Sequence, residues 1–249
     1  MAFIDYTEAF FWTLTYIIIA LTGIINKNEK RICIPLPTLW INFSWEAASV
    51  IYSFEGGFHL SAQGDFIRFS WFFFDLFILF CFFQKNKFSK SNLLALIGYL
   101  SIFVVLAPLF FYSFIYHELG MPITAFIIDA LMEIFFWFHR KKLDPSNRLL
   151  IGITKILGDL FAGIYYGPVH PVVVVLACVA FCFDVLYIIF AIKERKLDPK
   201  IDAQFIESKK ALVKKVKIFL MGEKQHQKKR NYKKKQKNKK THRKKRKKV

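Results

Sequence analysis

Long apolar stretches separated by short charged segments restrict most strongly what this chain can fold into. A helix needs about 20 mostly apolar residues, with a range of roughly 17–25, to cross the hydrocarbon core of a bilayer. The sequence contains stretches of this kind at residues 7–25, 36–54, 66–83, 93–116, 121–138, 149–166 and 171–192. We therefore predict an all-α membrane protein with seven transmembrane helices.

Two other classes of protein are excluded by the composition. The chain contains 30 Phe, 10 Tyr and 5 Trp, whereas disordered chains are poor in aromatic residues. Its four Cys residues show neither a CxxC pair nor a Cys–His zinc spacing, so we predict neither a disulfide framework nor a zinc site. The first apolar stretch lacks a basic leader and a small-residue cleavage site, so we expect it to be a retained helix, not a signal peptide.

Charge divides the chain into two regions. The sequence has 37 Lys and Arg against 18 Asp and Glu, a net charge of +19, although 55% of it is hydrophobic. We predict a transmembrane domain over residues 1–192 and a basic tail over residues 193–249. Within the tail, residues 203–221 mix apolar residues with lysines, as an interfacial helix does, and the residues after it are predicted to be disordered.

The tail is expected to bind anionic lipid head groups, because each basic residue near such a surface contributes about 1 kcal/mol of attraction. RNA would also attract the charge, but no nucleic-acid recognition module accompanies it. We therefore predict no specific nucleic-acid partner, and we assign the tail to anchoring and not to the activity.

The positions of the positive charges predict the orientation of the helices. Apart from Arg68 and Lys155, every Lys and Arg lies in residues 26–35, 84–92 or 139–148 or in the tail. These segments follow the first, third, fifth and seventh stretches, so they share one side of a seven-span protein. By the positive-inside rule, the tail is predicted to be cytoplasmic and the N-terminus outside or lumenal.

The two halves of the transmembrane domain resemble each other. The segments that align are 45–52 with 158–165 and 72–80 with 181–190. The first alignment places Glu46 on Asp159, and the second places Asp75 on Asp184. We predict two parallel three-helix repeats joined by a linker helix, the fourth; chance similarity between Phe-rich segments is the alternative.

Acidic residues occur inside the predicted spans, where a central charge costs about 2.5–3.5 kcal/mol even on insertion scales. They are Glu46, Asp75, Asp129, Glu133, Asp159 and Asp184. Residues of this kind normally face the interior of a helix bundle or a wet cavity. Functional roles are therefore their first interpretation.

Lys155 lies within the predicted span 149–166, four residues before Asp159. That spacing places both on one helix face, so a structural ion pair is an alternative to function for these two. Asp129 and Glu133 also share a face, and they repel each other unless one is protonated.

Glu46, Asp75 and Asp184 have no obvious basic partner in the sequence. Removal from water disfavours a charged carboxylate, so we expect neutral carboxylic acids that can donate a proton. The alternative is structural, with each acid forming only a hydrogen bond between helices.

Several Trp and Tyr residues could line a pocket and stabilise a cation over their ring faces. They are Trp40, Trp45, Trp71, Trp137, Tyr52, Tyr165, Tyr166 and Tyr187. Packing between helices, or an aromatic belt at the membrane surface, explains such residues equally well.

A motif around the second span resembles a known family. The sequence LeuProThrLeuTrpIleAsnPheSerTrpGlu at 36–46, followed by TrpPhePhePheAspLeu at 71–76, is similar to the small seven-span membrane terpene cyclases of fungal meroterpenoid and indole-diterpene pathways. That family carries a similar Asn-x-x-Trp-Glu motif, an Asp on an aromatic third span, and an acidic residue on its last span that Asp184 matches. The Lys-rich tail departs from the family.

The resemblance implies a metal-independent isomerase or lyase that cyclises a prenyl chain, commonly one with a terminal epoxide, after protonating it. It implies that Glu46 and Asp184 are the catalytic acids. Asn42, Trp45 and Asp75 are added as members of the motif. Asn42 and Asp75 are expected to orient Glu46. Asp159 is added as a supporting residue because the predicted repeat aligns it with Glu46. The sequence has no Asp-Asp-x-x-Asp or Asp-x-Asp-Asp cluster, so no metal or other cofactor is predicted.

Two other functions remain open from the sequence. Two triplets around a linker helix are similar to the SWEET sugar carriers and PnuC vitamin carriers, with a substrate site between the halves. The Pro-Gln loop and the Trp-rich nucleoside signature expected of those families are not found in the sequence. A membrane scaffold whose tail recruits anionic partners is the third reading, and it leaves the acidic residues within the spans unexplained.

Overall fold

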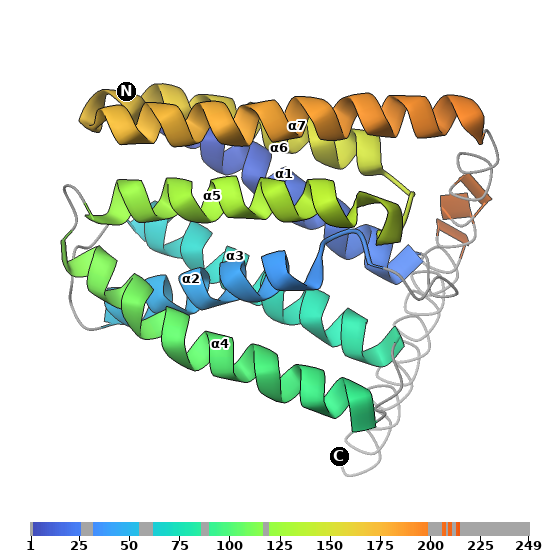
Figure 1. Ribbon diagram of the computed structural model, residues 1–249, viewed down its shortest axis with the longest axis horizontal. Coiled ribbons are helices and arrows are strands. Elements are labelled where there is room, and N and C mark those ends of the chain that lie inside the picture. Colours follow the sequence, from blue (N-terminus) through green and yellow to red (C-terminus); the bar gives the residue numbers. More distant parts are fainter. Residues whose placement is uncertain are drawn as a thin grey trace, which may run out of the picture. The chain divides into compact units, whose positions relative to one another are not determined.

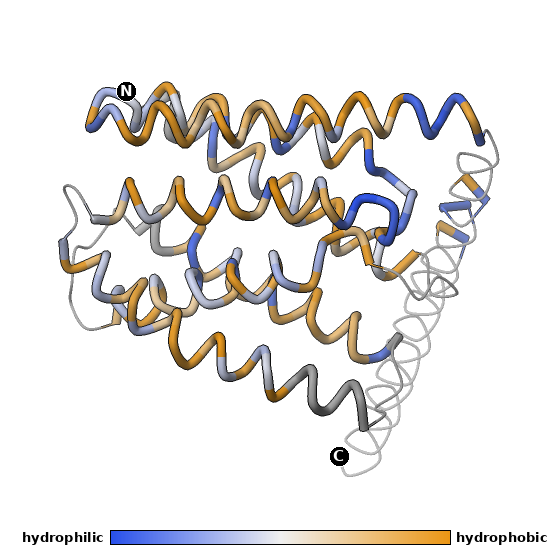
Figure 2. The backbone as a smooth tube through the Cα atoms, viewed as in Figure 1, coloured by the Kyte–Doolittle hydropathy of each residue, from blue (hydrophilic) through white to orange (hydrophobic). Residues whose placement is uncertain are grey.

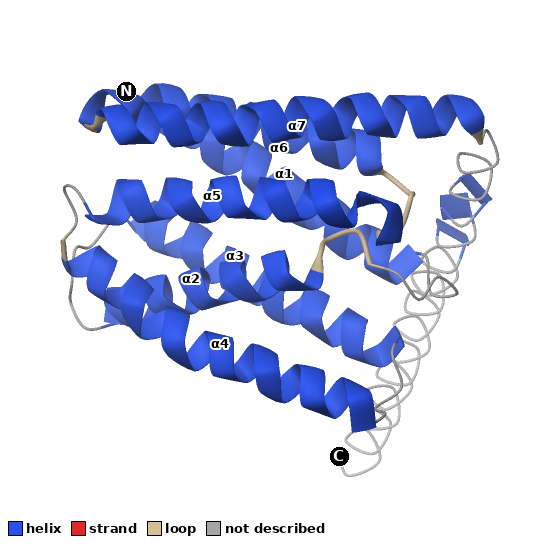
Figure 3. Ribbon diagram, in the orientation of Figure 1, coloured by secondary structure: helices blue, strands red, loops and turns tan. Residues whose placement is uncertain are grey.

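The computed structural model describes residues 2–25, 32–54, 62–85, 90–116 and 120–198, and in the tail 206–207, 209–210 and 213–214. Helices and short connections account for all of these residues, and none of them is in a strand (Figure 3). The chain divides into two compact units, Met1–Asp202 and Ala203–Val249. In the second unit the described residues are helical; the rest of the predicted interfacial helix and basic tail lies outside the described residues.

Each of the seven predicted apolar stretches is a helix in the structure. The helices are α1 (Ala2–Ile25), α2 (Leu36–Phe54), α3 (Ala62–Lys85), α4 (Lys90–Ile115), α5 (Gly120–His139), α6 (Arg148–Tyr166) and α7 (Pro171–Leu197). Two short 3-10 helices, η1 (Arg140–Lys142) and η2 (Gly167–Val169), follow α5 and α6. The all-helical fold class predicted from the sequence is therefore confirmed.

Six of these helices, all except α2, are long and apolar enough to cross a membrane. Helix α2 has 19 residues, but ten of them are buried, including Asn42, Ser44 and Glu46. It packs against α3, α4 and α5, so most of its surface faces other helices. A helix enclosed in this way does not need the apolar surface that lipid requires of its neighbours.

The third helix of each half packs against the other two helices of that half. Helix α3 contacts α1 and α2, and α7 contacts α5 and α6 (Figure 1). The halves join where α1 packs along α6 and α2 packs against α5, while α4 covers α2 and also contacts α5. This arrangement brings the middle of α2 and the middle of α5 to the interior of one bundle.

Polarity in the bundle is distributed as expected for a protein surrounded by lipid. Large apolar side chains face outward, among them Val104 (67% exposed) and Phe73 (62% exposed). Isolated hydrophilic positions interrupt the apolar helices (Figure 2). Several acids of these helices are buried, among them Glu46, Asp75 and Asp159. Apolar surface of this extent would drive aggregation in water, so the described helices support a membrane protein.

Helices α1 and α6 approach each other closely at Gly158. A Cβ atom there would lie 2.8 Å from Cδ1 of Trp12. We expect Gly158→Ala to destabilise the bundle by about 1–3 kcal/mol, the usual range for overpacking. The measurement is thermal unfolding of the protein purified in detergent.

Gly98 is the matched control, because a Cβ atom at that position would have no neighbour within 4 Å. Gly98→Ala should leave the unfolding temperature unchanged or raise it, since Ala favours a helix more than Gly does. Equal stability of Gly158→Ala and the wild type would contradict the close contact between α1 and α6.

Candidate functional site

A cavity of about 340 Å³ lies among helices α1 to α6. Its wall comes mainly from the first part of α1, α3 and α5 and from the last part of α2, α4 and α6. These parts lie at the end of the bundle where α1 begins (Figure 1). Ligand pockets typically measure about 300–1,000 Å³, so this cavity is large enough for a small apolar molecule.

Aromatic rings form much of the cavity wall, and contacts hold them in place. The Trp45 ring lies 4.5 Å from that of Phe114, and the Tyr16 ring lies 6.1 Å from that of Trp71. Trp71 Nε1 donates a 2.9 Å hydrogen bond to Thr13 Oγ1. Fixed rings of this kind bind apolar chains and attract cations through their faces.

Glu46 contributes its carboxyl group to this wall and is only 3% exposed. Ser49 Oγ donates to Glu46 Oε2 over 3.5 Å and, at 2.8 Å, to the Glu46 backbone carbonyl. Arg68, on α3, also lines the cavity and interacts electrostatically with Glu46, so the expectation that Glu46 has no basic neighbour was wrong. The predicted acid thus lies at a place where it can reach a bound molecule.

Asn42 links the cavity to a deeper acid. Its Nδ2 donates to the Tyr16 hydroxyl and, at 2.8 Å, to Asp75 Oδ2. Tyr16 and Asn42 line the cavity, whereas Asp75 lies behind them, fully buried. The sequence predicted that Asn42 and Asp75 orient Glu46, but among the described residues their hydrogen bonds join them to each other and to Tyr16.

A second buried polar cluster is centred on Lys155, on α6. The Lys155 ammonium donates to Glu133 on α5 and, at 3.0 Å, to Asp184 on α7. It also lies 3.9 Å from the centre of the Phe136 ring. The sequence had suggested an ion pair between Lys155 and Asp159, which lie on the same helix. Among the described residues Lys155 instead pairs with Glu133 and Asp184, on the two facing helices.

Asp184 therefore differs from the sequence expectation in two respects. It was expected to have no basic partner, but it is fully buried against Lys155. It was expected to reach the substrate, but it is not among the residues that line the cavity. Sequence separation of 29 residues concealed its partner, which only the packing of α6 against α7 reveals.

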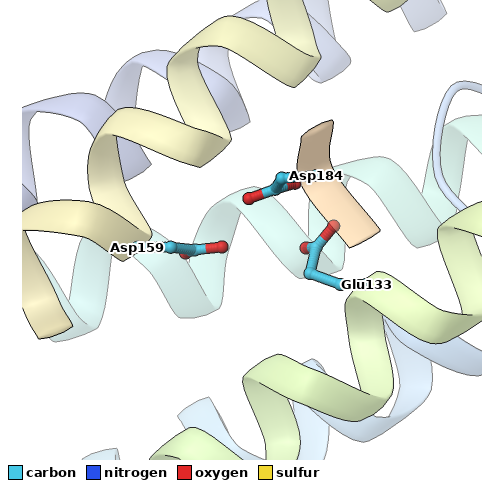
Figure 4. Close-up of side chains that lie close together, drawn as sticks. All are labelled: Glu133, Asp159 and Asp184. Carbon is cyan, nitrogen blue, oxygen red and sulfur yellow. The ribbon is translucent and has the colours of Figure 1, made fainter. Parts of the chain in front are cut away.

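Three carboxyl groups converge beside this lysine. Ligand atoms of Glu133, Asp159 and Asp184, from α5, α6 and α7, lie within 4.8 Å of one another (Figure 4). Such a set could in principle hold a divalent cation. The Lys155 ammonium, however, already contacts two of the three and supplies a positive charge there, which opposes metal binding.

Asp129 is the residue that sequence reasoning left without a role. It lines the cavity together with Glu46 and interacts electrostatically with Asp159. The spacing of Asp129 and Glu133 showed that they share a face of α5. It could not show that one faces a cavity and the other a lysine.

Comparisons with known proteins found no matching family model, no matching curated protein and no matching solved structure. Function is therefore inferred from the chemistry of the cavity and from the motif at residues 36–46.

Proposed function

We propose that the protein is a membrane-embedded, terpene-cyclase-like enzyme that cyclises a prenyl chain by protonation, without a metal. The observation that carries this proposal is the buried Glu46 carboxyl group in the wall of a cavity lined in large part by aromatic rings. The resemblance of residues 36–46 and 71–76 to the membrane terpene cyclases supports it. The substrate would be a prenylated, lipid-like molecule, in keeping with a cavity enclosed by apolar helices.

The reaction assigned to Glu46 is general acid catalysis. Its neutral carboxyl group gives a proton to a terminal epoxide or alkene, and the resulting carbocation is attacked by the next double bond of the chain. Ring faces such as those of Trp45 and Phe114, which line the cavity, stabilise the cation. Loss of a proton then gives an isomer of the substrate.

Seven membrane spans, with the N-terminus outside or lumenal and the tail cytoplasmic, are part of the proposal. Basic residues gather at the bundle end opposite the start of α1, in η1 and in the last turn of α7 (Figure 2). The positive-inside rule places that end in the cytoplasm. The cavity would then lie in the outer or lumenal half of the membrane.

Two parallel three-helix repeats are also proposed, and matching hydrogen bonds support them. Asn42 stands four residues before Glu46, as Lys155 does before Asp159. Asn42 donates to Asp75 over 2.8 Å, and Lys155 donates to Asp184 over 3.0 Å. Equivalent contacts thus join the second helix to the third in each half.

This internal symmetry favours a second candidate function, a small-molecule transporter similar to the SWEET and PnuC carriers. An acid-lined cavity between two repeats would suit a cationic substrate or proton coupling. The cyclase is preferred because the cavity is aromatic and the motif around Glu46 resembles that family. Uptake of a water-soluble substrate into vesicles would favour the transporter.

The test of the proposed function is product analysis in cells that express the protein. Cells are supplied with terminal epoxides of farnesyl- and geranylgeranyl-substituted phenols, and their lipid extracts are separated by chromatography and mass spectrometry. A new isomer of unchanged mass, present with the wild type and absent with Glu46→Gln, supports the cyclase. The same isomer from both proteins at equal expression contradicts the role of Glu46.

The basic tail is proposed to bind anionic lipid head groups and to take no part in the chemistry. The helices that line the cavity all belong to the first of the two units of the chain, Met1–Asp202. Truncation after Asp198 should therefore leave the amount of isomer per membrane-inserted protein unchanged within about twofold. Loss of activity at normal membrane levels would assign the tail a catalytic or assembly role.

A further inference from the structure

Asp129 and Glu46 lie in the wall of the same cavity, on α5 and α2. Glu46 is positioned to give a proton to a bound molecule. A cyclisation that conserves mass must also remove one proton from the final carbocation. Asp129 supplies a second carboxyl group in the cavity wall, and removal of this proton is the step that still needs an acceptor.

Asp129 is the first member of a chain of carboxyl groups that runs away from the cavity. Asp129 interacts electrostatically with Asp159, and carboxylate oxygens of Asp159, Asp184 and Glu133 lie within 4.8 Å of one another. Asp159, Asp184 and Glu133 are each at most 2% exposed. The chain ends at the Lys155 ammonium, which contacts Glu133 and Asp184.

These carboxyl groups receive few hydrogen bonds from other donors. Both carboxylate oxygens of Asp159, with Asp184 Oδ2 and Glu133 Oε1, accept none from the N–H or O–H groups of the described residues. Two carboxyl groups form a hydrogen bond only when one of them carries a proton that it can donate. Asp159, Asp184 and Glu133 are buried close together, so protons shared among the carboxyl groups would satisfy these oxygens.

The number of protons follows from charge balance. Four carboxyl groups beside one ammonium form a neutral group only when three of them are protonated, which leaves one negative charge on the chain. Lys155 supplies one positive charge at its end, so the network as a whole is neutral. Neutrality is what a low-dielectric interior favours, because an unbalanced buried charge costs several kcal/mol.

We propose that Asp129 is the proton acceptor that ends the cyclisation, and that Asp159, Asp184, Glu133 and Lys155 form a proton-sharing network behind it. The inference rests on the proposed function for the substrate, but the network itself is defined by this chain alone. Asp129 is then the catalytic residue, since it faces the cavity. Asp184 is a positioning residue that acts through Asp159.

The proton balance closes over one reaction cycle. Glu46 loses its proton to the substrate, and the Asp129 carboxyl later takes a proton from a carbon next to the carbocation. The electrons of that C–H bond form the new C=C bond, and the network now carries one additional proton. After the product leaves, the network releases this proton and Glu46 regains one, so both start the next cycle unchanged.

Infrared spectroscopy of the purified full-length protein in H₂O and D₂O tests the network without a substrate. Asp129→Asn is expected to remove one protonated carboxyl from the carbonyl-stretch band that shifts in D₂O, because three acids beside Lys155 need only two protons. Glu194→Gln is the matched control. Glu194 is paired with Arg148, so its loss should leave that band unchanged. An unchanged band in Asp129→Asn would overturn the shared-proton network.

Lys155→Met provides a second spectroscopic test. Without the ammonium, neutrality requires a fourth proton, so the band should gain one protonated carboxyl. A folded Lys155→Met protein with no such gain would overturn the charge count. If this variant does not fold, Asp129→Asn alone decides the matter.

Product analysis tests the catalytic role of Asp129. With Asp129→Asn, substrate consumption should continue while the alkene isomer falls about tenfold or more, as expected on loss of a general base. The trapped cation would instead bond to the oxygen of water and lose a water proton to the Glu46 carboxylate, giving an alcohol of substrate mass plus water. An unchanged proportion of alkene would overturn the role of Asp129. Absence of any isomer with the wild type would instead count against the proposed function, and the infrared result would still decide the network.

Discussion

Replacing Glu46 by Gln is expected to lower the rate of cyclisation by about 10²–10⁴-fold, the usual contribution of a general acid. Gln has nearly the shape of a neutral Glu and keeps a group that can accept from Ser49. It cannot release a proton to an epoxide. The loss should therefore appear in the rate of product formation, with little change in the amount of folded protein in the membrane.

Glu8→Gln is the matched control for this prediction, since Glu8 lines the same cavity from the first turns of α1. It removes an acid of the same kind and should keep more than about half of the activity. Glu46→Asp should restore part of the activity, because the carboxyl group returns at a shorter reach. Equal losses in Glu8→Gln and Glu46→Gln would indicate a general effect of cavity charge in place of a specific acid.

The helices could be predicted closely because lipid imposes a simple pattern on sequence. Residues 36–54 were predicted as one span, and α2 is Leu36–Phe54. The ends of helices could be predicted less closely, because a helix can continue past the last apolar residue into water. Helix α7, for example, continues beyond the apolar residues into the basic turn that ends at Leu197. The sequence pattern alone could not show that α2 is largely enclosed by other helices.

Part of the candidate site was visible in the sequence for a similar reason. Glu46 and Asn42 stand out because polar side chains are costly in a membrane, and both line the cavity. The partners of these groups were not predictable, because they depend on how distant helices pack. Lys155 finds its acids on α5 and α7, and the acid four residues away on its own helix is not its ion-pair partner.

Lys155→Met is expected to lower the stability of the folded protein by about 3–5 kcal/mol, the cost of breaking a buried ion pair by removing one partner. The change leaves Glu133 and Asp184 without their cation, and it removes the contact of the ammonium with the Phe136 ring. Met has nearly the length of Lys, so the loss of packing should be small. Thermal unfolding in detergent measures the effect.

A second substitution separates charge from packing in this prediction. Adding Glu133→Gln to Lys155→Met removes one of the acids that the first change left without a cation, so the double variant should be more stable than Lys155→Met alone. Glu133→Gln by itself should be destabilising, because Asp184 would then be the remaining ion-pair partner of Lys155. Such non-additivity is the expected behaviour of groups that share one buried network. If the two changes are simply additive, Lys155 fills space among the helices, and balancing charge is not its role.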